Sequence, residues 1–218
     1  MDVSGIQLRA LCHLDRLQPQ FAAFVGAVSD GSPPVEGMSV LYIELSPSNW
    51  VFPVVDRVLK SVAVVPGAQQ VERQYGMFEV HSASQAEVLR AAEVALEAIG
   101  LPETDRYAPR VVSEQVITNI HPNQAQVLNR FNRGTMIEAG QTMLVLEVEP
   151  AAYVCLAANE AEKAAPVFLN HLESVGMFGR MWLSGTEAEI AAAREAALTA
   201  LSSVAGRPAQ ALEGKEYG

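Results

Sequence analysis

Cysteines, aromatic residues and clusters of basic residues are scarce in this chain of 218 residues. Its two cysteines, Cys12 and Cys155, cannot form a disulfide framework or a zinc site unaided, and we expect both to be small buried apolar residues. The formal net charge is −10 and no run of Lys or Arg occurs. The electrostatic footprint of a nucleic-acid or anionic-lipid partner is therefore missing.

Long apolar segments and catalytic motifs are missing as well. No uninterrupted apolar stretch reaches about 18 residues, and the amino terminus lacks the apolar core of a signal peptide, so we expect a soluble cytoplasmic protein. The four histidines do not have metal-binding spacings, and the segment 176–180, GMFGR, lacks the lysine of a phosphate loop. No GxSxG or GxGxxG motif occurs. The sequence thus predicts no catalytic residues, no metal and no cofactor.

What the chain does contain is an internal repeat. Shifting residues 8–100 by 103 positions lays them on 111–203 without a gap. Residues coincide in turns, helices and strands alike, which scattered chance matches do not do. The coinciding pairs include Pro19 and Pro122, Ala22 and Ala125, Gly37 and Gly140, Glu44 and Glu147, Pro47 and Pro150, Lys60 and Lys163, and Gly76 and Gly179. We infer two fused copies of one domain, 1–104 and 105–218, joined through the polar connector 101–110.

Hydrophobic periodicity predicts the same order of elements in both repeats. In the first repeat these are a strand at 8–14, a helix at 19–28, a strand at 40–46, a helix at 48–62, two strands within 63–81 and a helix at 84–100; their counterparts are 111–117, 122–131, 142–149, 151–165, 166–184 and 187–203. Ser84 and Glu87 predict a capping box, and Gly100 a C-terminal cap. The fold class is therefore α+β, with each repeat a small, mostly antiparallel sheet covered by helices.

Short phrases along the chain are similar to one known family. They are LDRLQPQ at 14–20, VERQYG at 71–76, PRVV at 109–112, NRFNRG at 129–134, GQT at 140–142, LEVEPAAY at 146–153, LAANEAEKAA at 156–165 and GMFGR at 176–180. With them, the chain resembles the tandem-domain shell proteins of bacterial microcompartments, and more narrowly their circularly permuted, carboxysome-type subclass. The resemblance extends from about residue 8 to about residue 204.

The resemblance implies an assembly. Three two-domain chains would form a homotrimer, a flat pseudo-hexagonal tile in a proteinaceous shell in the cytoplasm. Its partners would be hexameric shell proteins along the edges and pentameric proteins at the vertices. In this subclass two trimers can also stack face to face and enclose a chamber between two pores that open and close.

Residues present in both repeats recur six times around such a ring, and this singles out two lysines. Lys60 and Lys163 occupy the same turn of a helix, and each follows a small polar residue, Asp56 or Asn159, by four positions. A long lysine stem can lie along a neighbour while its ammonium bonds a carbonyl. Together with the family's edge motif, this predicts that Lys60 and Lys163 lie at the tile edge.

Residues present in one repeat recur only three times, and Glu72 and Arg73 are such a pair. Their counterparts are Val175 and Gly176. By resemblance, this segment lines the central pore. Neighbouring residues of an extended segment point to opposite sides, so a rearrangement could exchange which side chain faces the axis. We expect Glu72 and Arg73 to close the pore by pairing between chains, and Val175 and Gly176 to line the open state.

One alternative of another class remains open at this point. A small-molecule-binding regulatory trimer with duplicated ferredoxin-like domains would also place two similar domains in one chain. A shell tile forms sheets or co-assembles with other shell proteins, whereas a regulatory trimer stays discrete and binds an effector. The lysines that recur in register favour the tile.

Overall fold

The computed structural model describes residues 5–29 and 31–208. The first repeat contains β1 (Gln7–Leu14), α1 (Pro19–Val28), β2 (Ser39–Ser46), η1 (Ser48–Trp50), α2 (Val51–Ser61), β3 (Val65–Glu72), β4 (Tyr75–Ser82), α3 (Gln85–Ile99) and η2 (Glu103–Asp105). The second contains β5 (Arg110–Ile117), α4 (Pro122–Leu128), β6 (Thr142–Glu149), η3 (Ala151–Tyr153), α5 (Val154–Ala164), β7 (Phe168–Glu173), β8 (Gly179–Gly185) and α6 (Glu187–Ser202). The order of elements predicted from periodicity is confirmed.

Each repeat forms a four-stranded antiparallel sheet, with strand orders β1-β2-β4-β3 and β5-β6-β8-β7. Even the irregularities recur at the same repeat positions. The first strand shifts register between Leu8 and Ala10 in one sheet and between Val111 and Ser113 in the other. The α+β class and the repeat are therefore both confirmed.

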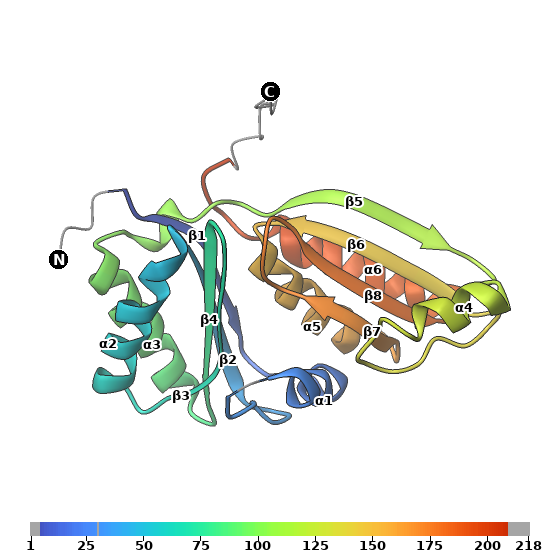
Figure 1. Ribbon diagram of the computed structural model, residues 1–218, viewed down its shortest axis with the longest axis horizontal. Helices are drawn as coiled ribbons and strands as arrows, with labels where there is room; N and C mark the ends of the chain where they lie inside the picture. Colours follow the sequence, from blue (N-terminus) through green and yellow to red (C-terminus); the bar gives the residue numbers. More distant parts are fainter. Residues whose placement is uncertain (1–4, 30, 209–218) are drawn as a thin grey trace.

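The two repeats lie side by side (Figure 1), and one hydrophobic cluster contains residues of both. Helices α2 and α3 cover one face of the first sheet, and the second repeat lies against its other face. Helices α5 and α6 cover one face of the second sheet. Helix α1 packs on β7 and α5 of the second repeat, while its Phe21 ring stacks on Tyr42 of its own repeat. The contact made by β1, β2 and α1 with η3, α5 and β7 is called the inter-repeat contact below.

Two local predictions need correction. Helix α4 ends at Leu128 rather than at residue 131, because the Asn129 side chain bonds both the N–H and the carbonyl oxygen of Ile137 and turns the chain there. Only half of the capping box at Ser84 forms, since the Glu87 carboxylate accepts from the Ala63 N–H instead. Gly100 has φ of 69° and caps α3 as expected.

Candidate functional site

Glu72 and Arg73 lie at the tip of the β3–β4 hairpin. Glu72 ends β3 and is the register partner of Tyr75, so Arg73 and Gln74 form the turn. Both charged residues are exposed. Arg73 has φ of 50°, a left-handed conformation that costs a non-glycine residue about 1–2 kcal/mol. Its carbonyl oxygen accepts a hydrogen bond from Ser48 Oγ at 2.8 Å, which anchors the tip to η1.

The corresponding loop of the second repeat lies against this tip. Gly176 has φ of 107°, and a Cβ atom there would be 2.6 Å from Oε2 of Glu72. The missing side chain therefore leaves the room that the Glu72 carboxylate occupies. Val175 is half-buried and packs against the shared core. The structure thus brings Glu72 and Gly176 together, whereas Val175 contacts the core.

A cavity of about 590 Å³ between the repeats adjoins the hairpin tip. Its lining includes Phe24, Tyr42, Glu72, Arg133 and His171. Burial lowers the pKa of His171, whose ring packs on Trp182 with the centroids 4.6 Å apart. Because Glu72 lines this hollow, its side chain has room to change position.

Lys60 lies in the last turn of α2 and is freely accessible. Its side chain is 73% exposed, and Nζ is 2.6 Å from Oδ2 of Asp56. An exposed pair of this kind contributes less than about 1 kcal/mol. The ammonium group can therefore exchange Asp56 for a partner on a neighbouring molecule at little cost.

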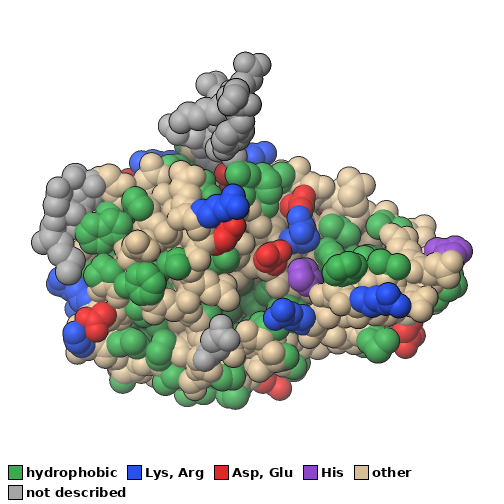
Figure 2. All heavy atoms as spheres, in the orientation of Figure 1, with side chains coloured by type: hydrophobic (Ala, Val, Ile, Leu, Met, Phe, Trp, Pro, Cys, Tyr) green, Lys and Arg blue, Asp and Glu red, His purple; other side chains and the backbone are tan. Residues whose placement is uncertain are grey.

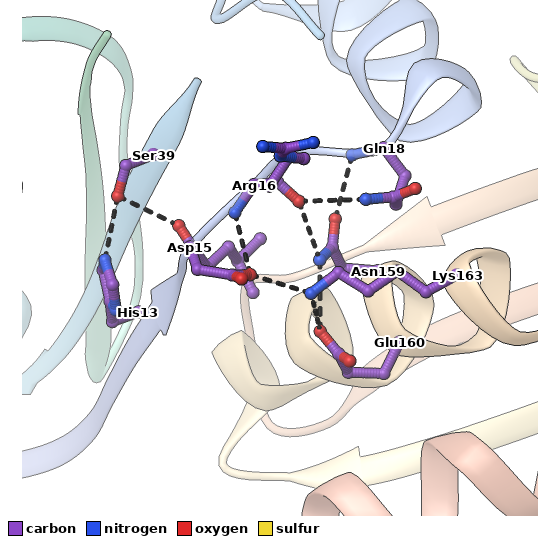
Figure 3. A network of polar contacts seen from close by, with 9 residues as sticks. His13, Asp15, Arg16, Gln18, Ser39, Asn159, Glu160 and Lys163 are labelled. Atoms are coloured by element: carbon purple, nitrogen blue, oxygen red, sulfur yellow. Dashed lines mark hydrogen bonds and ion pairs between the residues drawn. The ribbon is translucent and has the colours of Figure 1, made fainter. Parts of the chain in front are cut away.

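Lys163 lies instead in the inter-repeat contact (Figure 3). Its Nζ is 2.7 Å from both Asp15 Oδ1 and Glu160 Oε1, and its side chain is 29% exposed. Burial lowers the pKa of Lys163, but the hydrogen bonds to these carboxylates outweigh burial, and the net direction is upward. The hydrogen bond from Lys163 lowers the pKa of Asp15. Lys60 and Lys163 therefore have different surroundings in a single chain.

The start of α1 is fixed by two side chains that sequence reasoning missed. Glu162 accepts from the N–H groups of Gln20 at 2.7 Å and Phe21 at 3.0 Å, and Asn159 Oδ1 accepts from that of Gln18 at 3.0 Å. These donors have no partner within the helix, and a carboxylate is favoured at a helix N-terminus. Burial raises the pKa of Glu162, and the two N–H donors oppose that rise. The sequence does contain a signal for Glu162: its counterpart in the first repeat is the apolar Leu59, so the carboxylate is needed in the second repeat alone.

The recurring carboxylates Glu44 and Glu147 are both paired with an arginine. Arg9 Nε lies 2.6 Å from Oε1 of Glu44, and Oε2 accepts from the Ala152 N–H at 2.9 Å, across the inter-repeat contact. Glu147 pairs with Arg180 instead, at 2.6 Å. Burial raises the pKa of Glu44, while Arg9 and the N–H donor stabilise its charged form. These carboxylates are held in ion pairs.

The described residues also show the state of the two thiols and the absence of a metal-binding cluster. Cys12 and Cys155 are free and buried as expected, and burial raises the pKa of Cys12 to about 12. Within 5–29 and 31–208, no three His, Cys, Asp or Glu side chains are grouped so that they could hold a metal ion. None of the described helices combines the length and hydrophobicity needed to cross a membrane.

Comparison with known proteins agrees with this architecture. The family model of the CsoS1D N-terminal domain matches residues 8–105. The carboxysome shell protein CcmP of Synechococcus elongatus is 46% identical over 203 residues, which are 93% of this chain and 95% of that protein. The carboxysome shell protein CsoS1D of Hydrogenovibrio crunogenus is 42% identical, over 90% of this chain and 96% of that protein.

Two solved structures with the same fold come from the RMM microcompartment. The double ringed trimeric shell protein MSM0271 of the RMM microcompartment has a TM-score of 0.90 and 39% identity, covering 94% of this chain and all of that one. The fused permuted hexameric shell protein MSM0275 has a TM-score of 0.88 and 37% identity, covering 91% of this chain and 99% of that one.

The chain thus has two α+β domains whose corresponding loops touch at Glu72 and Gly176. This architecture is that of a tandem-domain shell protein of bacterial microcompartments. Within that class, the chain belongs to the family of the carboxysome shell proteins CcmP and CsoS1D. Its role is structural, as a component of a microcompartment shell.

Proposed function

We propose that three copies of this chain close into a pseudo-hexagonal shell tile with a gated central pore. The observation that carries the proposal is the contact between Glu72 and Gly176, because corresponding loops of the two repeats must meet if both surround one axis. The solved relative described as a double ringed trimeric shell protein supports a trimer, and stacking of two trimers. The domains are 1–104 and 105–218.

The tile forms part of the shell and lets metabolites pass through its pore, and it does not act as an enzyme. Support for a non-catalytic role comes from the buried thiols and from the ion-paired carboxylates Glu44 and Glu147. Its partners are hexameric shell proteins along the edges and pentameric shell proteins at the vertices. Small molecules cross the tile through the pore.

The gate consists of the strained hairpin tip. Three copies of Glu72 and Arg73 surround the axis, and each glutamate pairs with an arginine of the next chain in the closed state, which removes the repulsion among three like charges. Opening moves Glu72 off Gly176 and into the adjoining hollow. Arg73 has an unfavourable φ, so a rearrangement of the turn relieves this backbone strain.

Removing both gate side chains should leave the pore permanently open. In electron microscopy, the double variant Glu72→Ala/Arg73→Ala should show a wider axial opening than the unchanged protein, and reconstituted shells should admit charged metabolites faster. The matched control is Arg90→Ala/Glu93→Ala, which removes an exposed ion pair of the same charges on α3. Unchanged pore diameter and unchanged permeability in the gate variant would show that these residues are not the gate.

Removing the exposed lysine should prevent lateral assembly. We expect Lys60→Ala to form trimers of normal size but no extended sheets, because its ammonium no longer reaches a neighbouring tile. Arg57→Ala, an exposed cation on the same helix, serves as the control. Electron microscopy of the purified protein distinguishes the two results, and sheets of normal extent in Lys60→Ala would remove Lys60 from the tile edge.

A further inference from the structure

The β3–β4 hairpin consists of an exposed tip on a fixed base. Tyr75, the first residue of β4, is 8% exposed, and the guanidinium of Arg9 lies 3.7 Å from the centroid of its ring. Gly76 follows, and a Cβ atom there would clash with the carbonyl oxygen of Ser48, so η1 packs directly on β4. Because the base is held on both sides, movement of the hairpin is confined to residues 72–74.

The charged side chains of the tip do not fix its conformation within one chain. Charged groups of both signs gather at the surface where the hairpin tip meets the second repeat (Figure 2). Glu72 and Arg73 are both exposed. Ion pairs between exposed side chains contribute little in water. The conformation of the turn within a chain must therefore depend on its backbone contacts.

One buried hydroxyl group bonds the backbone of this turn. Ser48 is the first residue of η1 and is 8% exposed, and its Oγ donates a hydrogen bond to the carbonyl oxygen of Arg73 at 2.8 Å. Within residues 5–29 and 31–208, this is the one hydrogen bond between a side chain and the backbone of residues 72–74. Arg73 has φ of 50°, which is unfavourable for most residues other than glycine. The bond from Ser48 thus holds a strained residue.

The second repeat shows the same two positions without strain and without the bond. The counterpart of Arg73 is Gly176, whose φ of 107° costs a glycine nothing. The counterpart of Ser48 is Ala151, which has no hydroxyl group. The two positions therefore differ together: serine occurs with the strained arginine, and alanine occurs with the glycine. This pairing indicates that the hydroxyl of Ser48 serves the conformation of the turn.

We propose that Ser48 is a positioning residue of the gate. Its hydroxyl holds Arg73 in the left-handed conformation and so keeps Glu72 against Gly176. The proposal rests on the gate proposed above and specifies what sets the resting state of that gate. When the bond breaks, Arg73 leaves its unfavourable φ, and Glu72, its neighbour in the chain, moves with it. The hydroxyl therefore favours the closed state, and the backbone strain favours the open state.

These two opposing effects are similar in size, which allows the turn to change between states. When the carbonyl oxygen of Arg73 is released at the exposed tip, it bonds water instead, so only the net value of that exchange is lost. A net hydrogen bond of this kind shifts an equilibrium by about 3- to 10-fold. Relief of the left-handed φ shifts it in the other direction by a similar factor. The bond from Ser48 thus biases the gate without locking it.

The test is hydrogen exchange of the full chain, measured by mass spectrometry of peptides that contain residues 70–76. Ser48→Ala should speed exchange of this segment by about 3- to 10-fold, because the turn opens more often. Alanine fits this place in the short helix, since Ala151 occupies it in the second repeat. Ser48→Thr keeps a hydroxyl and should exchange at the rate of the unchanged protein.

Ser61→Ala is the matched control. Its Oγ also donates to a carbonyl oxygen at 2.8 Å, that of Arg57 on α2, and its loss should leave exchange of residues 70–76 unchanged.

Ser48→Ala/Arg73→Gly tests whether the serine acts through the turn. This variant has the residue pair of the second repeat, and glycine adopts the left-handed conformation without help from a hydroxyl. Exchange should therefore return to about the rate of the unchanged protein. If Ser48 only supported η1, a change at Arg73 would not restore slow exchange.

The outcomes separate the role of Ser48 from the gate itself. Faster exchange in Ser48→Ala, rescue by Arg73→Gly, and a larger fraction of open pores in electron microscopy of Ser48→Ala would together support the proposal. Unchanged exchange in Ser48→Ala, or no rescue by Arg73→Gly, would overturn the role of Ser48 and leave the gate intact. Faster exchange and rescue with an unaltered pore would instead overturn the gate, because the turn would then move without opening it.

Discussion

Replacing Arg9 with alanine should lower the free energy of unfolding by about 3–5 kcal/mol, the usual cost of breaking a buried ion pair from one side. Glu44 is 1% exposed, and Arg9 Nε is 2.6 Å from its carboxylate. The guanidinium also lies over the ring of Tyr75, 3.7 Å from the centroid. Without Arg9, Glu44 keeps only the Ala152 N–H and must either remain as a poorly compensated charge or take up a proton.

The second repeat provides the matched measurement. Arg180→Ala removes the partner of Glu147, but the two side chains are 42% and 21% exposed, so water replaces the lost interaction. We expect a cost below about 1 kcal/mol. Urea unfolding at one fixed protein concentration compares the variants, since association contributes to apparent stability. Equal losses for Arg9→Ala and Arg180→Ala would show that burial of the Arg9 pair is not what stabilises it.

These two pairs show how the repeats diverged while keeping one fold. Glu44 lies on β2 and receives its arginine from β1, whereas Glu147 on β6 receives its arginine from β8. Both flanking strands reach the carboxylate because the central strand lies between them. A glutamate at this position can therefore be neutralised from either side. The flanking residues decide which side, because the counterpart of Arg9 is Val112 and the counterpart of Arg180 is Met77.

The repeat explains why so much of the fold was predictable. Once residues 8–100 align with 111–203, an ambiguous segment in one copy can be interpreted from the clearer copy. The end of α4 was not predictable in this way, because Asn129 acts through bonds to Ile137, eight residues further along the chain. The half-formed capping box at Ser84 has a similar cause, since Ala63 competes for the Glu87 side chain.

The surroundings of the candidate site residues were less predictable, for a physical reason. Sequence identity gives Lys60 and Lys163 the same helix position, but only Lys163 lies beside Asp15 of the other repeat. Which face of one repeat contacts the other depends on tertiary packing, and a periodicity argument contains no information about it. The roles of Lys60 and Lys163 at the tile edge, and of Glu72, Arg73, Val175 and Gly176 at the pore, therefore stay predictions.

A second large effect is expected at two equivalent glycines. A Cβ atom on Gly76 would come closer than 3.0 Å to the carbonyl oxygen of Ser48, and one on Gly179 would meet that of Ala151 in the same way. In both repeats the obstacle is backbone of the short helix that crosses the strand, which cannot rotate aside. Gly76→Ala and Gly179→Ala should each lower the free energy of unfolding by about 3 kcal/mol, as overpacking of a rigid site does.

Gly26→Ala separates this close contact from a general effect of replacing glycine. Gly26 is exposed on α1, and a Cβ there meets nothing within 4 Å. The substitution should therefore stabilise the protein by about 0.5–1 kcal/mol, since alanine favours the helix. Thermal and urea unfolding of the three variants should give opposite signs for Gly26 and the strand glycines. If Gly76→Ala and Gly179→Ala are neutral, the strands do not lie as close to η1 and η3 as the structure places them, and the hairpin tip that Ser48 holds loses its rigid support.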